Sequence, residues 1–166
     1  MWIGKREKLC DSMRVSQVYK EIAEKDLKSS EILFENELYN EAAYYIMQYM
    51  EKCVKEKLCR TIDVTNTYFS NKLREIGHSL DASVEFLIEI LSQGNSVLKE
   101  QITKQLVEGV LRNIRFSGLY NEVRYPRFNY KYNQYTILNI TKEDCEALKQ
   151  ISENLRKYLD DLDKLL

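Results

Sequence analysis

The chain of 166 residues is long enough for one domain with a sizeable hydrophobic core, and no low-complexity tract divides it in two. Its 25 basic and 26 acidic residues nearly cancel, which excludes a general attraction to nucleic acid or anionic membranes, so any such affinity must come from a local patch. One proline, five glycines and 31% charged residues favour long helices joined by a few loops.

The N-terminal stretch MWIGKREKLC has no apolar signal-peptide core, and no apolar run approaches the ~20 residues that span a bilayer. We therefore expect a cytoplasmic protein with reduced cysteines and no membrane contact. The four cysteines form no CxxC pair and His78 is the sole histidine, so neither a metal site nor a cofactor is expected. Cys53 and Cys145 fall on apolar helix faces, where we expect them to be small buried hydrophobic residues.

Residues 1–14 are mixed and mildly basic, and they predict an N-terminal arm or frayed first turn ahead of a single helical domain, residues 15–166. A first helix is expected over residues 16–37, where apolar residues recur near helical spacing. Asp26 interrupts its apolar face. This carboxylate lies either in a locally hydrated stretch of helix or beside an interior arginine as its counter-ion.

Residues 39–58 predict an amphipathic helix around which the rest of the chain is organised, with Asn40 as its expected N-cap. Tyr45 and Tyr49 lie on the side opposite the apolar stripe, and they indicate a second contact surface with either a neighbouring helix or a partner chain. The apolar stripe consists of Ala43, Ile46, Met47, Met50, Cys53, Val54 and Leu58, and the polar side carries Gln48, Glu51, Lys52, Lys55 and Glu56.

The polar residues 59–70 predict a connection with at most a short helical turn. A third helix should begin at Leu80 and end at Gly94, and a fourth should start from a cap at Asn95 or Ser96 and close at Gly118. An irregular segment, residues 115–140, precedes a last helix.

The last helix is expected to begin at Thr141, with Glu143 and Asp144 in its first turn, where acidic groups meet the positive end of the helix dipole. Its apolar residues step by three and four and form a long seam. The predicted fold is therefore all-α, an up-and-down antiparallel bundle of about five helices with little or no strand.

With the helices placed, the chain resembles the HEPN domain family. The resemblance extends over residues 15–166 and lies in four segments, in the family's order: SEILFENELYNEAAYYIMQYMEKCVKEKL after a first helix, Gly77-His78-Ser79-Leu80, Val123-Arg124-Tyr125-Pro126, and Thr141-Lys142-Glu143-Asp144-Cys145. It implies an up-and-down helical bundle that is usually a homodimer. It also implies either a bacterial toxin–antitoxin system with a small nucleotidyltransferase-like protein as partner, or an RNA-cleaving enzyme.

In the HEPN family that the chain resembles, the RNA-cleaving members use an arginine followed by four to six residues and then a histidine. Arg112-Asn113 is similar to the opening of that motif, but Ser117 stands where the histidine is expected, and a serine hydroxyl does not titrate near neutral pH. Arg74 and His78 have three residues between them and would share a helix face. The catalytic candidates are therefore His78, Arg74 and Arg112, in a degenerate arrangement, and a non-catalytic domain is the favoured interpretation.

The segment of residues 115–140 interleaves arginines and a lysine with six aromatic residues. Guanidinium groups bind phosphates and aromatic faces stack on bases, so this composition favours nucleotide or single-stranded RNA binding. The alternative is structural, with the same side chains clamping the loop over the end of the bundle or onto a second subunit. The expected ligand-binding residues are Arg124, Tyr125, Arg127 and Lys131, with His78 as a further candidate.

Three functional hypotheses follow. The first is a non-catalytic HEPN-like homodimer that binds a nucleotide or RNA at a basic, aromatic cleft. The second is a metal-independent endoribonuclease toxin. The third is a protein-interaction module that binds its partner through Tyr45 and Tyr49.

Overall fold

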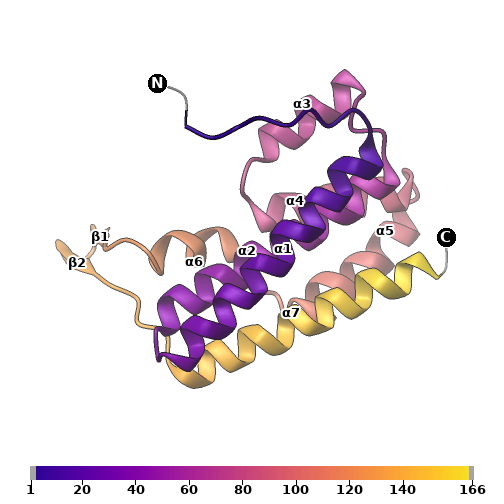
Figure 1. Ribbon diagram of the computed structural model, residues 1–166. Helices are drawn as coiled ribbons and strands as arrows, with labels where there is room; N and C mark the ends of the chain where they lie inside the picture. The colour runs from indigo at the N-terminus through magenta and orange to yellow at the C-terminus, as the bar shows by residue number, and fades with distance from the viewer. Residues whose placement is uncertain (1–2, 165–166) are drawn as a thin grey trace.

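The computed structural model describes residues 3–164, and within them it contains seven α-helices, one π-helical segment and a two-stranded sheet (Figure 1). The all-α class expected from the sequence is confirmed. In chain order the elements are α1 (Ser12–Glu35), α2 (Tyr39–Thr61), α3 (Thr67–Ile76), α4 (Leu80–Ser92), α5 (Ser96–Thr103), the π-helix η1 (Lys104–Val110), α6 (Phe116–Glu122), β1 (Arg127–Asn129), β2 (Gln134–Thr136) and α7 (Lys142–Asp163).

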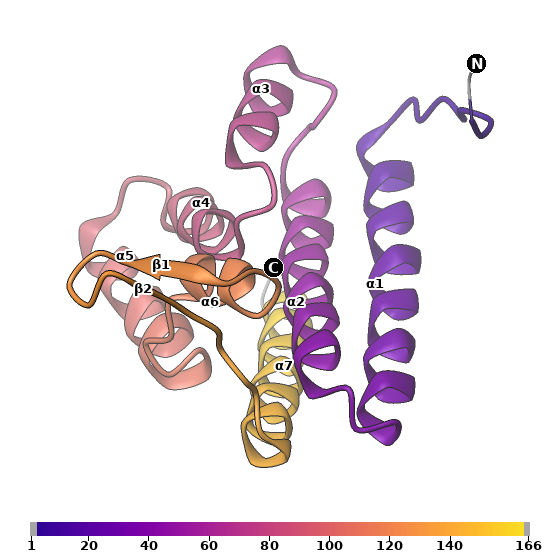
Figure 2. The same ribbon diagram turned by 90° about the vertical axis from the view of Figure 1, so that its left-hand side faces the viewer.

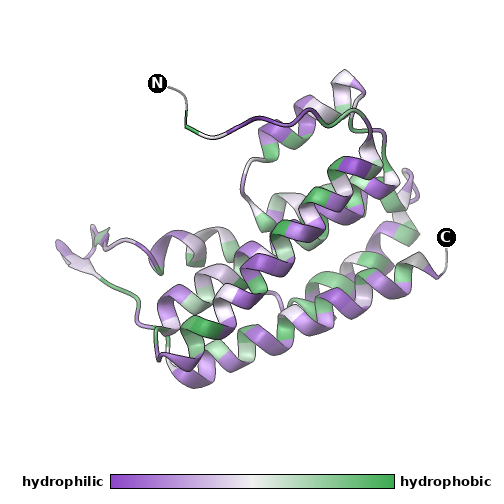
Figure 3. Cartoon of the chain, in the orientation of Figure 1, coloured by the Kyte–Doolittle hydropathy of each residue, from purple (hydrophilic) through white to green (hydrophobic). Residues whose placement is uncertain are grey.

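Helix α2 is the centre of the bundle. It contacts α1, α4, α6 and α7, and Figure 2 shows α1 on one side of it with α4, α6 and the strands on the other. Its predicted apolar stripe is buried throughout, and the core continues into Leu87 of α4, Leu106 of η1 and Leu155 of α7. Hydrophobic and hydrophilic residues alternate along α7, as a helix with one buried face requires (Figure 3).

The helices around α2 run in different directions. Ser16 of α1 donates a hydrogen bond to the carbonyl of Glu56, and Asp26 pairs with Lys52, so α1 and α2 are antiparallel. Helices α2 and α7 instead run the same way, because residues 40 and 140 meet at one end of the bundle and Glu56 meets Arg156 toward the other. The chain must therefore return the full length of the bundle before α7 begins.

The first two helices begin at positions other than those expected. Asp11 accepts a hydrogen bond from the backbone N–H of Arg14 at 2.8 Å, and this cap starts α1 at Ser12, inside the expected arm. Asn40 is not the N-cap of α2. That position belongs to Leu38, which makes no side-chain cap, and Asn40 lies within the first turn, where its amide serves another part of the chain.

Asn40 closes the loop that leads into α7. Its Nδ2 donates to the carbonyls of Val123, at 3.2 Å, and Leu138, at 2.8 Å. Its Oδ1 accepts the N–H of Ile140 at 2.7 Å. One side chain therefore satisfies three backbone groups that belong to no helix.

Helix α3 was missed in the sequence, where residues 59–70 were expected to form a connection. Asn66 caps it by accepting from the N–H of Tyr68, and it ends at Gly77, whose φ of 59° is readily adopted by glycine. None of its residues is fully buried, so its apolar pattern is weak. Because α3 stops at Ile76, the expectation that Arg74 and His78 share a helix face is wrong.

The expected fourth helix is shorter and less regular than its pattern suggested. Asn95 caps α5 as expected, but the helix widens into η1 and ends at Val110. Arg112 and Asn113 follow with φ values of 54° and 58°, a left-handed pair that turns the chain away. Gly118 therefore does not close this helix; it lies inside α6.

Part of the expected irregular segment is ordered as a hairpin. β1 and β2 pair antiparallel, with Phe128 opposite Tyr135, and Figure 1 shows this hairpin, residues 127–136, projecting from one end of the bundle. The last helix agrees with the sequence, because Thr141 and Asp144 form a reciprocal capping box at the start of α7. Within residues 3–164 no helix has both the length and the apolar character to cross a bilayer.

We expect Asn40→Ala to lower the free energy of unfolding by about 3 kcal/mol, because three backbone groups lose a partner at ~1 kcal/mol each. For a domain of this size that corresponds to a fall in Tm of about 6–12 °C, measured by calorimetry. Asn139→Ala, at an exposed position of the same loop, should leave Tm nearly unchanged. Equal Tm values for the two variants would contradict the assigned role of Asn40.

The cysteines make a second prediction. Cys53 and Cys145 are 1% and 0% exposed, as expected, and Cys59 is buried too, whereas Cys10 is exposed. Burial raises the pKa of the Cys53 thiol to about 11 and that of Cys59 to about 12. A chromogenic disulfide reagent at pH 8 should therefore modify Cys10 rapidly, and the other three cysteines only after unfolding in guanidinium. Rapid native-state modification of all the thiols would contradict this packing.

Candidate ligand-binding site

Arg124 is the centre of an aromatic cluster beside the end of α6. Its guanidinium carbon lies 4.8 Å from the ring centre of Tyr44, 5.8 Å from Tyr120 and 4.9 Å from Tyr125. Its Nη2 donates to the hydroxyl of Tyr125 at 2.8 Å, and the hydroxyls of Tyr44 and Tyr120 are 3.0 Å apart. We call these four residues the Arg124 cluster. It combines an exposed cation with ring faces, a pairing suited to a phosphate and an attached base.

Tyr120 of this cluster is protonated at neutral pH. Burial and the hydrogen bond with Tyr44 raise the pKa of Tyr120 to about 12, so its phenol stays protonated. The cluster contains no aspartate or glutamate, so the positive charge of Arg124 has no counter-ion within it. An anionic group of a ligand is the natural partner for that charge.

The hairpin extends the basic and aromatic surface. Tyr130, Tyr132 and Tyr135 are 89%, 60% and 71% exposed. Exposure of three large aromatic side chains on one short hairpin is unusual. Lys131, in the turn, has its ammonium 5.2 Å from the ring centre of Tyr132. Arg127 pairs with Glu122 at the base of the hairpin. A cavity of about 490 Å³ runs between Tyr125, Arg127 and α6.

A second cavity, of about 280 Å³, lies on the other side of α6 and is called here the Glu51 pocket. Gln48 and Glu51 of α2 line it, together with His78 from the α3–α4 connection and Tyr120 from α6. Asn121 and Ser117 border both this pocket and the cavity beside Arg127, so one continuous surface passes over α6. Its apolar walls are formed by Met47, Ile76, Leu80 and Phe116.

Two ion pairs adjoin the Glu51 pocket, and Glu51 is the member that lines it. Lys52 pairs with Asp26 of α1 at 2.8 Å, which identifies the counter-ion of Asp26 as a lysine and not an arginine. Glu51 pairs with Lys55 at 2.5 Å, and its side chain is 3% exposed although the sequence placed it on the polar side of α2. Lys55 also donates to the carbonyl of Gly77 and thereby holds the connection that carries His78.

Helix α6 is positioned by Asp81. Arg115, at the N-cap of α6, makes no side-chain cap, but the Asp81 carboxylate accepts the N–H of Phe116 at 3.1 Å and of Ser117 at 2.9 Å. Asp81 lies in the first turn of α4 and thus supplies the cap from another helix. The cap orients Tyr120, and through Tyr120 the Arg124 cluster.

The structure brings together only some of the residues singled out in the sequence. Arg124, Tyr125 and Arg127 lie around one surface, and His78 borders the neighbouring pocket, while Lys131 lies farther out in the hairpin turn.

Neither Arg74 nor Arg112 lines the Glu51 pocket with His78. Arg74 is exposed and bonds to Asn71 of its own helix at 3.3 Å. Arg112 is exposed after η1, and Ser117 uses its backbone N–H to bind Asp81. His78 is 3.9 Å from the Glu51 carboxylate, measured from Nδ1. The geometry therefore gives no pairing of arginine and histidine.

Tyr49 packs inside its own chain. Its side chain is 8% exposed and lies close to Arg156 and Asp160 of α7. Burial raises the pKa of its phenol above the ordinary value. Of the two alternatives for Tyr49, a neighbouring helix is therefore the one realised. Tyr45 is half-buried and stacks edge-on against Tyr44 of the Arg124 cluster, with ring centres 5.4 Å apart.

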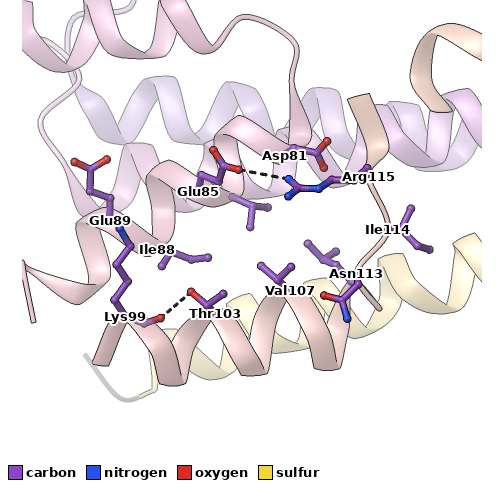
Figure 4. A pocket seen from close by; sticks show the side chains of 12 residues that line it. Asp81, Glu85, Ile88, Glu89, Lys99, Thr103, Val107, Asn113, Ile114 and Arg115 are labelled. Atoms are coloured by element: carbon purple, nitrogen blue, oxygen red, sulfur yellow. Dashed lines mark hydrogen bonds and ion pairs between the residues drawn. The ribbon is translucent and has the colours of Figure 1, made fainter. Parts of the chain in front are cut away.

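A further groove of about 410 Å³ lies between α4 and the α5–η1 helix (Figure 4). Ile88 and Val107 point into it, and Glu85 and Arg115 face one another across its mouth at 3.6 Å. Acidic and basic side chains alternate on its rim, and it holds no buried polar group without a partner among residues 3–164. Among these residues the groove provides an apolar surface without an unpartnered buried polar group that could recognise a ligand.

No group of three or more His, Cys, Asp or Glu side chains within residues 3–164 is arranged to hold a metal ion. The residues that sequence reasoning missed as site residues are Gln48, Glu51, Tyr44, Tyr120 and Asp81. These residue types are common on helix surfaces, so they did not stand out in the sequence. The spacing of Gln48 and Glu51, which places both on one face of α2, is the sequence feature that could have indicated the site.

The sequence model of the HEPN domain matches residues 16–162. No curated protein matches the chain. No solved structure matches it either.

The largely buried pair of Asp26 and Lys52 leads to a stability prediction. Lys52→Met leaves the Asp26 carboxylate unpaired and largely buried, so we expect a loss of about 3 kcal/mol in urea unfolding. Combining it with Asp26→Asn should recover at least half of that loss, because the unpaired charge is gone. Lys25→Met, an exposed neighbour on α1, serves as control, with an expected change within ~0.5 kcal/mol. No difference between Lys52→Met and this control would contradict the pairing.

Proposed function

Because the chain belongs to the HEPN domain family, we propose that it is a non-catalytic RNA- or nucleotide-binding domain that binds its ligand along the Arg124 cluster and the hairpin. The observation that carries the proposal is the exposure of three hairpin tyrosines beside the basic side chains of Arg124 and Lys131. Aromatic side chains at such positions stack on unpaired bases, and guanidinium groups bind the phosphates between them.

Each part of the surface has a role in this proposal. Arg124 binds a phosphate, and its hydrogen bond to Tyr125 holds the guanidinium in place before the ligand arrives. Tyr130, Tyr132 and Tyr135 stack on bases, and Lys131 adds charge at the hairpin turn. The near-zero net charge of the chain makes this patch the source of affinity, so binding should be local and sensitive to salt.

Family membership supports further parts of the proposal. These are a homodimer in the cytoplasm and a nucleotidyltransferase-like protein as its partner in a toxin–antitoxin pair. Light scattering after size exclusion separates the monomer from the dimer directly.

Arg124→Ala should weaken the binding of a labelled single-stranded RNA about tenfold and reduce the slope of log affinity against log salt by about 1, since one phosphate contact is lost. Fluorescence anisotropy at low and high salt measures both quantities. Arg124→Lys should restore the slope but only part of the affinity, because lysine lacks the planar fork. Lys28→Ala, on α1 across the bundle, is the charge-matched control (Figure 2). Unchanged RNA affinity in a folded Arg124→Ala protein would contradict the proposal.

Tyr130→Ala and Tyr135→Ala should each weaken RNA binding about five- to a hundredfold, because stacking contributes ~1–3 kcal/mol per base. Both side chains are exposed, so Tm should stay constant. Tyr68→Ala, at an exposed tyrosine on α3, is the matched control. Full RNA affinity in the hairpin variants would instead favour a structural role for these tyrosines.

A further inference from the structure

The one carboxylate that lines the Glu51 pocket is already paired. Glu51 Oε1 lies 2.5 Å from Lys55 Nζ, and the pair of Asp26 with Lys52, at 2.8 Å, lies outside the lining and beside Gln48. A bound cation or anion would leave one charge without a partner in a partly dehydrated site, which is costly. The pocket is therefore suited to a neutral chemical group.

Two hydrogen-bonding atoms in this region remain without a partner. Glu51 uses Oε1 for Lys55, and Gln48 uses Oε1 to accept from Lys52 at 2.7 Å. Glu51 Oε2 and Gln48 Nε2 have no hydrogen-bond partner among residues 3–164, and the Lys52 ammonium lies 3.9 Å from Oε2. The two residues are 2% and 8% exposed, and both line the pocket. A complementary ligand must present a donor next to an acceptor.

The lining and surroundings of the pocket favour a ring with apolar faces. Met47, Ile76, Leu80 and Phe116 provide apolar walls, and Tyr120 stands between the pocket and Arg124. A ring held in the pocket would thus have a cation within reach for an attached phosphate. A nucleobase combines apolar faces with a hydrogen-bonding edge and a phosphate attached through the sugar.

We infer that the Glu51 pocket binds a guanine base by its Watson–Crick edge, an assignment that rests on the proposed RNA or nucleotide binding. The ring N1–H of guanine donates to Glu51 Oε2, and its O6 accepts from Gln48 Nε2. A ring N–H next to a carbonyl is a stronger donor than the exocyclic amino group of adenine or cytosine, and the guanine amino group adds a second donor on the carboxylate side. Charged acceptors discriminate most strongly among such donors.

Isothermal titration calorimetry with guanosine, adenosine, uridine and cytidine tests this directly, because nucleosides carry no phosphate for Arg124. Guanosine should bind at least tenfold more tightly than the other three nucleosides. Equal affinity for all four, or no binding of any, would overturn the assignment. Uridine binding as tightly as guanosine would also overturn it, because uracil shares the ring N–H and carbonyl but not the amino group.

Two variants assign the preference to named atoms. Glu51→Gln should reduce guanosine affinity at least tenfold, to the level of adenosine, but it also removes the ion pair with Lys55. Gln48→Met keeps all four charges and removes the donor to O6, together with the oxygen that accepts from Lys52 at 2.7 Å, so it should lose the preference for guanosine in a protein that circular dichroism shows to be folded. Gln101→Met, exposed on α5, is the matched control. A guanosine preference that survives Gln48→Met in a folded protein would overturn the inference.

Failure of this inference and failure of the proposed function give different results. Tyr130→Ala should weaken RNA binding but keep the nucleoside preference, because the hairpin tyrosines lie outside the pocket. RNA binding without any nucleoside preference would refute the guanine site but would still agree with RNA binding by the hairpin surface. Absence of both kinds of binding would refute both.

Discussion

The burial of α2 on all sides is the constraint on which the rest of the structure depends. Five of its polar residues, Gln48, Glu51, Lys55, Glu56 and Lys57, are buried together with its apolar stripe. Charges removed from water cost several kcal/mol each unless they are paired. Two of its neighbours supply such partners: Asp26 of α1 pairs with Lys52, and Arg156 of α7 pairs with Glu56 at 2.6 Å. Burial lowers the pKa of Arg156, but the hydrogen bond and charge of Glu56 outweigh it, so the guanidinium stays charged.

The same pairing leads from the core to the surface. Lys55 neutralises Glu51 and holds the carbonyl of Gly77, which fixes the turn into α4. Ser79 then caps α4, and Asp81 in its first turn caps α6. Helix α6 in turn places Tyr120 against Tyr44 and Arg124. These hydrogen bonds hold the residues of the Glu51 pocket and of the Arg124 cluster in position, so both are preorganised.

The sequence predicted well whatever depends on local chemistry. The stripe of α2, the Asn95 cap, the Thr141 capping box and the buried Cys53 and Cys145 all follow from spacing and cap residues within a few positions. It failed where the partner is distant. The counter-ion of Asp26 and the cap of α6 by Asp81 join residues far apart in the chain. Glu51 looked exposed, because amphipathic patterns do not show how many neighbours surround a helix.

The parallel course of α2 and α7 requires the chain between them to return along the bundle, but α6 already ends beside the start of α7, so this return does not explain the hairpin. The carbonyls of Val123 and Leu138 both accept from Asn40 Nδ2, so the two ends of the segment meet at one side chain. A short turn would join ends that lie so close, and the extra residues add only the modest entropy of a longer loop. A clamp onto the bundle would bury its aromatic rings, yet Tyr130 is 89% exposed. The hairpin is therefore not required by the packing of this chain, and its tyrosines are available to a ligand.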